Sequence, residues 1–280
     1  MKTRIYNDSF PLSLRRGVRG EGNRLDKLFA EKKNNLLNIF FTAGFPQLDS
    51  TTEIMLALQK SGADIIEIGM PYSDPVADGP VIQFSNNIAL KNGMNMQLLF
   101  QQMKEVKDDM NIPVVLMGYF NPVLQYGVEN FCADAKAAGA DAIILPDLPM
   151  HEFESLYKKI FEQHGLHFIF LITPETTDQR IKKADTLSSG FLYAVSSSST
   201  TGAKKEAGSK NEYFKRLSAM KLQNPVMIGF GIHDHNGFTE ACAFASGAII
   251  GTAYINAIRD AENIDEATET FTRHILTGKE

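Results

Sequence analysis

One short phrase recurs three times along the chain, each time between a helix-like segment and an apolar run. It reads Ser61-Gly62-Ala63-Asp64, Ala138-Gly139-Ala140-Asp141 and Ser246-Gly247-Ala248. Glycine suits the left-handed residue that ends a helix, and a short apolar run suits a strand buried on both faces of a parallel sheet. Each phrase therefore predicts a helix-to-strand turn in an α/β protein.

Five further apolar runs, at residues 37–41, 113–117, 168–172, 190–195 and 225–228, bring the predicted strands to eight. Segments with apolar residues at helical spacing lie between them, at 52–60, 97–107, 131–138, 153–163, 213–220 and 237–245. Eight strands alternating with helices over about 250 residues favour a single-domain (β/α)8 TIM barrel. A doubly wound open sheet is the alternative. It usually has fewer strands and a glycine-rich turn after the first one, which Thr42-Ala43-Gly44-Phe45-Pro46 does not resemble.

The charge distribution indicates a boundary near the amino end. Residues 1–24 carry six basic side chains against two acidic ones, whereas the whole chain of 280 residues has a net charge of −5. We therefore expect a flexible basic extension over residues 1–24 and one catalytic TIM-barrel domain over residues 25–280.

Composition and spacing exclude several classes of protein. A net negative chain lacks the clustered basic face of a nucleic-acid binder. The longest charge-free runs are interrupted by Pro, Gly, Asn, Ser or Thr, so they do not predict membrane helices. Cys132 and Cys242 are too few for a disulfide scaffold and fit a reducing cytoplasm. No metal is expected, because His233-Asp234-His235 would diverge at a helix start, where Asp234 suits a capping role.

In a TIM barrel, functional residues lie on the loops at the carboxyl ends of the strands. Gly229-Phe230-Gly231-Ile232 follows the seventh predicted strand, and Gly251-Thr252 follows the eighth and opens a helix. These positions match the usual phosphate site of such barrels, where backbone N–H groups and a helix amino end bind the dianion. Tight turns without a ligand are the alternative. The hydroxyl-rich loop at 196–203 could complete the same site.

The loop after the second predicted strand carries two candidate carboxyl groups. Glu67 ends an apolar strand, where burial is expected to raise its pKa toward neutrality, and Asp78 follows eleven residues later across a proline-rich loop. They form an acid–base pair in one interpretation. In the other, Glu67 has a structural partner and the loop is merely exposed. No lysine stands at a strand end, so the sequence does not indicate a Schiff-base aldolase.

Residues 67–83, EIGMPYSDPVADGPVIQ, resemble the signature of the tryptophan synthase alpha subunit family. Further matches follow in family order to the carboxyl end: Phe41-Thr42-Ala43-Gly44, Met117-Gly118-Tyr119, Asp147-Leu148-Pro149, Thr201-Gly202-Ala203, Gly229-Phe230-Gly231-Ile232 and Gly251-Thr252-Ala253. Two departures are Phe45, where the family usually has an acid, and Ser197, Ser199 and Thr200 in a loop that usually carries an arginine and a glycine.

The resemblance implies a lyase that cleaves indole-3-glycerol phosphate to indole and glyceraldehyde 3-phosphate by a retro-aldol reaction, without a cofactor. It assigns proton transfer to Glu67 and the indole N–H contact to Asp78. It implies substrate contacts at Phe40, Met117, Ile144, Tyr193 and Thr201. It implies phosphate contacts at Gly202, Phe230, Gly231, Gly251 and Thr252.

The resemblance also implies a partner, a beta subunit that uses pyridoxal phosphate to join indole to serine in an α2β2 complex. On the family pattern, Tyr72, Ser73, Asp74, Asn121 and Pro122 face this partner. On fold alone, a different phosphate-sugar barrel enzyme such as an isomerase stays possible, although residues 67–83 argue against it. Two further alternatives to the paired lyase stay open. One is a stand-alone indole-3-glycerol-phosphate lyase without a beta subunit, and the other is a binding module that mainly activates a partner.

Overall fold

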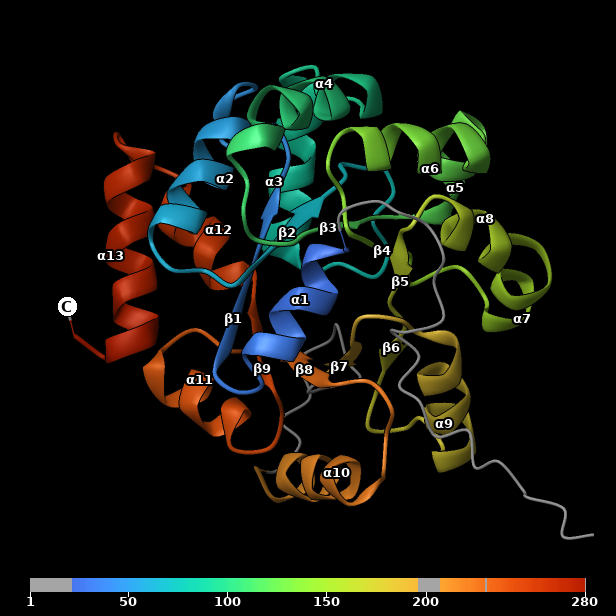
Figure 1. The fold of residues 1–280 in the computed structure, drawn as a ribbon. Coiled ribbons are helices and arrows are strands. Elements are labelled where there is room, and N and C mark those ends of the chain that lie inside the picture. The colour runs from blue at the N-terminus through green and yellow to red at the C-terminus, as the bar shows by residue number, and fades with distance from the viewer. Residues whose placement is uncertain (1–21, 196–206, 230, 280) are drawn as a thin grey trace, which may run out of the picture.

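A ring of parallel strands forms the centre of the computed structural model, which describes residues 22–195, 207–229 and 231–279 (Figure 1). The strands are β1 (Leu36–Thr42), β2 (Ile65–Gly69), β3 (Val114–Met117), β4 (Ala142–Ile144), β5 (His167–Phe168), β6 (Leu171–Ile172), β7 (Leu192–Val195), β8 (Val226–Gly229) and β9 (Gly247–Ile250). Their order is β5-β4-β3-β2-β1-β9-β8-β7-β6. All hydrogen-bonded neighbours are parallel, as buried βα repeats require.

The ring closes through β5 and β6, which the sequence predicts as one strand. The backbone N–H of Ile169 donates to Ile143 of β4, and the N–H of Tyr193 in β7 donates to Phe170, so the segment 167–172 bridges both edges. The structure interrupts this strand because the side-chain hydroxyls of Ser189 and Ser188 accept from the N–H groups of Phe168 and Phe170. The eight predicted strands and the TIM barrel are therefore confirmed, with one strand in two parts.

Helices surround the ring, and α1 lies over its centre in Figure 1. They are α1 (Arg24–Glu31), α2 (Ser50–Lys60), α3 (Pro80–Lys91), α4 (Met96–Val106), α5 (Phe120–Tyr126), α6 (Val128–Ala137), α7 (Met150–Glu152), α8 (Lys158–Gln163), α9 (Asp178–Leu187), α10 (Ala207–Ala219), α11 (His235–Cys242), α12 (Thr252–Ile258) and α13 (Ile264–Thr277). A 3₁₀ turn, η2 (Lys107–Asp109), follows α4, and a π-helical segment, η3 (Phe153–Tyr157), joins α7 to α8. None of the described helices has the length and apolar character of a membrane span.

Two apolar layers follow from the alternation of side chains along each strand. Leu37 and its alternate neighbours pack between the strands and the outer helices, whereas Leu36 and Ile65 belong to a cluster that fills the ring. Residues two positions apart on a strand share a face, so Asn38 and Glu67 lie on the interior side with Leu36 and Ile65. Both polar side chains are fully buried there.

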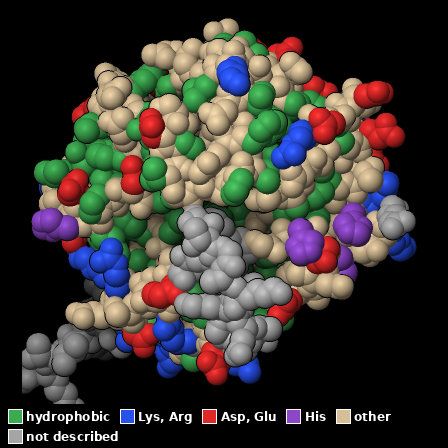
Figure 2. Space-filling model, turned by 180° about the vertical axis from the view of Figure 1, so that it is seen from behind, with side chains coloured by type: hydrophobic (Ala, Val, Ile, Leu, Met, Phe, Trp, Pro, Cys, Tyr) green, Lys and Arg blue, Asp and Glu red, His purple; other side chains and the backbone are tan. Residues whose placement is uncertain are grey.

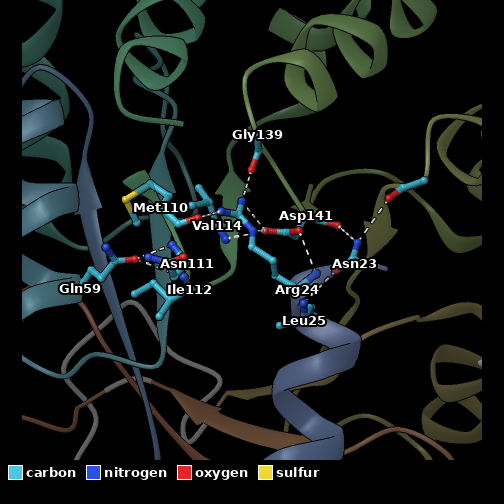
Figure 3. Close-up of polar contacts among 11 residues, drawn as sticks. Asn23, Arg24, Leu25, Gln59, Met110, Asn111, Ile112, Val114, Gly139 and Asp141 are labelled. Atoms are coloured by element: carbon cyan, nitrogen blue, oxygen red, sulfur yellow. Dashed lines mark hydrogen bonds and ion pairs between the residues drawn. The ribbon is translucent and has the colours of Figure 1, made fainter. Parts of the chain in front are cut away.

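Helix α1 closes the amino end of the ring. Leu25 belongs to the interior cluster and lies against Gly190. A Cβ added to Gly190 would stand 2.6 Å from Cδ2 of Leu25. Arg24 and Asp141 fasten the helix, as Figure 3 shows, through an ion pair of 2.8 Å. The side chain of Asn23 donates to the Asp141 carbonyl, and its Oδ1 caps the helix by accepting from the N–H of Leu25.

The first residues of α1 refine the predicted boundary. The charge pattern groups Arg24 with the basic extension, but the structure places it in α1 with its guanidinium bound to Asp141 and to the carbonyls of Met110 and Gly139. Arg24 therefore belongs to the folded domain and not to the extension. Residues 1–21 lie outside the described residues.

Candidate active site

A cavity of about 460 Å³ opens at the carboxyl ends of the strands. It is lined by Phe40 of β1, Gly69 of β2, Met117 of β3, Leu171 of β6 and Val195 of β7, together with the loop that carries Asp78. Its size and mainly apolar wall, with a few convergent polar groups, are typical of a small-molecule site. The cavity stands where a TIM barrel places its chemistry.

Glu67 lies beneath this cavity in the barrel interior. Its side chain is fully buried, and its Oε2 accepts a hydrogen bond of 2.9 Å from the Asn38 amide. Within the described residues, Oε1 has no hydrogen-bond partner. Burial raises the pKa of Glu67 to about 8, and the Asn38 hydrogen bond lowers it in part. Glu67 is therefore mostly a neutral acid at pH 7 and can both give and take a proton.

Asp78 lines the cavity and differs from Glu67 in its environment. The Tyr119 hydroxyl donates to its Oδ2 at 3.2 Å, and the Asn86 amide makes a longer contact of 3.5 Å with the same oxygen. Burial raises the pKa of Asp78 to about 6, while these two donors act in the opposite direction. Asp78 is therefore mostly ionised at pH 7, when Glu67 is mostly neutral.

Two glycines make room for the rings beside these carboxyl groups. A Cβ on Gly69 would stand 2.6 Å from Cζ of Phe40, and one on Gly229 would collide with the Tyr193 hydroxyl. The Tyr193 side chain is nearly buried. Burial, followed by the negative charges of Glu67 and Asp78, raises the pKa of Tyr193 well above its ordinary value, so its hydroxyl keeps its proton.

The predicted substrate contacts fall into three groups. Phe40 and Met117 line the cavity. Ile144 and Tyr193 belong to the cluster inside the ring and do not line it. Thr201 lies outside the described residues.

The described part of the predicted phosphate site lies on neighbouring strand ends. Gly229 of β8 pairs with Ile249 of β9. Gly231 comes two residues after Gly229, and Gly251 comes two residues after Ile249, so both glycines follow the ends of adjacent strands at the same level. Gly231 has a φ of +78°, a conformation that glycine adopts without strain. Gly251 immediately precedes α12, and Thr252 is the first residue of that helix. Gly202 and Phe230 lie outside the described residues.

The predicted partner-facing residues form one surface beside the cavity. The Asn121 amide donates to the Tyr72 hydroxyl at 3.3 Å, and the Tyr72 ring lies 5.2 Å from that of Tyr119. Ser73 donates to Asp74 in the same loop. Pro122 follows Asn121 in α5.

Sequence reasoning missed three polar side chains that contact the carboxyl groups. They are Asn38, Asn86 and Tyr119. Asn38 carried a usable signal, because a single amide interrupts the apolar strand at 36–41. Asn86 and Tyr119 reach Asp78 from α3 and from the loop before α5, and sequence spacing gives no measure of that approach.

The face in Figure 2 and the described polar motifs do not indicate a nucleic-acid or metal site. On the face in Figure 2, Lys and Arg side chains are scattered among acidic ones, unlike the continuous basic patch of a nucleic-acid binder. Asp234 caps α11 by accepting from the N–H of Gly237 at 2.8 Å. No group of three or more potential metal ligands lies together in the ranges that the structure covers.

The family model described as tryptophan synthase alpha chain matches residues 25–278. The chain belongs to this family. A tryptophan synthase alpha chain from Parabacteroides distasonis is 46% identical over 254 residues, which cover 89% of this chain and 99% of the relative. One from Christiangramia forsetii is 49% identical over 239 residues, or 85% of this chain and 93% of the relative. The resemblance predicted from residues 67–83 is confirmed.

Solved structures of the tryptophan synthase family share the fold. Tryptophan synthase subunit alpha from Legionella pneumophila superposes with a TM-score of 0.81 at 34% identity, covering 91% of this chain and 97% of the other. A chain of the tryptophan synthase complex from Pyrococcus furiosus superposes with a TM-score of 0.79 at 34% identity. The superposition covers 88% of this chain and 99% of the other.

Proposed function

We propose that Glu67 and Asp78 are the catalytic residues of this chain. As a tryptophan synthase alpha chain, the protein is a carbon–carbon lyase of tryptophan biosynthesis that cleaves indole-3-glycerol phosphate to indole and glyceraldehyde 3-phosphate. One observation carries the assignment of the residues: Glu67 is fully buried beneath the cavity, whereas Asp78 lines its wall. Burial raises the pKa of Glu67 to about 8 and that of Asp78 to about 6, on opposite sides of neutrality. Such a pair supplies an acid and an anion at the same pH.

Glu67 transfers the protons of the retro-aldol step. The neutral carboxyl group donates its proton to C3 of the indole, because C3 cannot leave as a carbanion. The bond between C3 and the side-chain carbon then breaks, and its electron pair returns to the ring. The carboxylate of Glu67 takes the proton of the side-chain hydroxyl as that oxygen becomes the aldehyde carbonyl. Glu67 ends the cycle protonated, as it began.

Asp78 stabilises the positive charge that the ring acquires on protonation. Its carboxylate accepts the indole N–H, and the Tyr119 hydroxyl holds it in place. Phe40 and Met117 pack against the ring, and the protonated Tyr193 hydroxyl supports the carboxyl groups. The phosphate binds at the backbone of Gly231, Gly251 and Thr252, together with Gly202 and Phe230. Thr201 is proposed to contact the substrate.

The reaction needs no cofactor in the alpha chain, because the two carboxyl groups supply the acid, the base and the charge stabilisation. Pyridoxal phosphate belongs to the beta subunit, and the chain works with that subunit in an α2β2 complex. We propose that Tyr72, Ser73, Asp74, Asn121 and Pro122 contact it. We also propose a cytoplasmic location, which suits the free thiols of Cys132 and Cys242.

Purified protein is expected to release indole from indole-3-glycerol phosphate with a bell-shaped pH dependence of kcat/KM. Glu67 must start protonated, so the rate falls above a pH of about 8, and Asp78 must be ionised, so it falls below about 6. The substrate phosphate also titrates near pH 6. Asp78→Asn is the control, since it should lower kcat/KM and flatten only the part of the acid limb due to Asp78. A profile that is flat from pH 5 to 9 would contradict both assignments.

The beta subunit is expected to bind the chain and to accelerate indole release. Size-exclusion chromatography with the cognate beta subunit tests this, and co-elution is the expected result. Tyr72→Ala should weaken co-elution while leaving indole release by the isolated chain within about twofold, since Tyr72 lies outside the residues that line the cavity. Separate elution with full activity would favour the stand-alone lyase instead.

A further inference from the structure

We propose that Asn38 is a positioning residue for Glu67, and that its amide holds Oε2 so that Oε1 exchanges protons with the substrate. This inference rests on the proposed role of Glu67. It starts from the placement of the two side chains, which lie fully buried on adjacent strands with Nδ2 of Asn38 2.9 Å from Oε2.

The position of Asn38 is costly for stability alone. It pairs with Ile65 of β2 and Ile249 of β9, and both of these belong to the apolar cluster that fills the ring. Its Oδ1 is buried without a hydrogen-bond partner in the described residues. A buried polar atom without a partner destabilises a fold by roughly 1–3 kcal/mol. An apolar side chain would avoid this cost, so the retained amide points to a task at Glu67.

The chemistry of the amide selects which carboxyl oxygen carries the proton. The Nδ2 group of Asn38 can only donate, so Oε2 serves as an acceptor in this contact. The proton of neutral Glu67 therefore resides on Oε1, where no described group competes for it. When that proton has left for the substrate, the Asn38 donor stabilises the carboxylate that must next accept the hydroxyl proton.

Among the described residues, the side-chain hydrogen bond to Glu67 comes from Asn38. Val115 of β3 and Phe40 of β1 stand opposite Glu67 in the two ladders, and both are apolar. In the described part of the chain, the titratable hydroxyl of Tyr193 on β7 experiences the charges of both Glu67 and Asp78. Asn38 is also the hydrogen-bond donor that lowers the pKa of Glu67 against the effect of burial. Loss of its amide should therefore raise that pKa further.

The test is the pH profile of indole release by Asn38→Leu, which has similar volume and no hydrogen-bonding group. We expect kcat to fall about 10- to 100-fold, as for loss of a hydrogen bond to a charged group, with KM changed less than about threefold. The alkaline limb should move to higher pH. Asn38→Val, which suits a strand, repeats the test if the leucine variant does not fold.

Thr42→Val is the matched control, because it removes a buried side-chain hydrogen bond, to Ser85, from the same strand. Its alkaline limb should stay in place. A folded Asn38 variant with unchanged kcat and an unmoved alkaline limb would overturn the inference, and so would an effect on KM alone. Glu67→Gln assayed in parallel separates the two ideas. If Glu67→Gln is active, the proposed catalytic role of Glu67 fails. If Glu67→Gln is inactive while the Asn38 variant keeps the wild-type kcat and alkaline limb, only the role of Asn38 fails.

Discussion

Replacing Glu67 with glutamine is expected to abolish turnover of indole-3-glycerol phosphate while leaving substrate binding largely intact. Glutamine has nearly the same shape but cannot donate or accept the transferred proton. Removal of a general acid–base group lowers rates by roughly 10²- to 10⁴-fold, and here one group serves both proton transfers, so the upper end applies. Indole release measures kcat, and equilibrium binding of the substrate to the inactive variant measures affinity. Turnover above a tenth of the wild-type rate would refute the role of Glu67.

Stability against pH provides the control for this substitution. The folded protein raises the pKa of Glu67 from 4.5 to about 8, so between these pH values it binds more protons than the unfolded chain. The wild-type free energy of unfolding should therefore fall as pH rises through that window. Glu67→Gln lacks this titrating group, so its free energy of unfolding should rise relative to that of the wild type as pH increases. The difference should reach at most ~5 kcal/mol at pH 8. A variant that is inactive but no less stable has lost chemistry and not its fold.

Replacing Asp141 with alanine is expected to destabilise the barrel by roughly 3–5 kcal/mol, the range for breaking one side of a buried ion pair. The Asp141 side chain is only 4% exposed, and it accepts from the Arg24 side chain and from the backbone N–H of Val114. Without the Asp141 carboxylate, the partly buried guanidinium of Arg24 and the N–H of Val114 at the start of β3 both lose an acceptor. Urea denaturation followed by circular dichroism measures the loss.

An exposed ion pair offers the comparison for Asp141. Glu154 and Lys183 also approach closely, at 2.6 Å, but both side chains are more than two-fifths exposed. Exposed pairs contribute little because water screens them, so Glu154→Ala should leave the denaturation midpoint unchanged. Equal midpoints for the two variants would show that the contacts of Arg24 with Asp141 do not fasten α1.

The strands and the carboxyl groups were predictable because their signals are local. A glycine-ended helix followed by an apolar run identifies a strand wherever it occurs, and a glutamate at the end of such a run is expected to be buried. The interruption after β5 was not predictable, because it depends on Ser188 and Ser189, some twenty residues further along the chain. The 153–163 helix was predicted as one element, and the apolar spacing did not reveal its π-helical segment.

The partners of each site residue depend on register, which periodicity does not supply. Asn38 meets Glu67 because β1 and β2 pair with Asn38 opposite Ile65. A shift of one residue would turn either side chain to the other face of the strand. Arg24 is a second residue whose partner the sequence pattern does not reveal. Its charge groups it with the basic extension, whereas its ion pair with Asp141 assigns it to the folded domain.

The packed interior of the barrel and the closure of its amino end by α1 decide from which side molecules reach the site. With Leu25 packed into the interior cluster, the described part of the chain leaves the carboxyl mouth as the route to Glu67. Reactant and products must then use the same opening in turn. A protein seated over that mouth would receive departing indole before the surrounding water could.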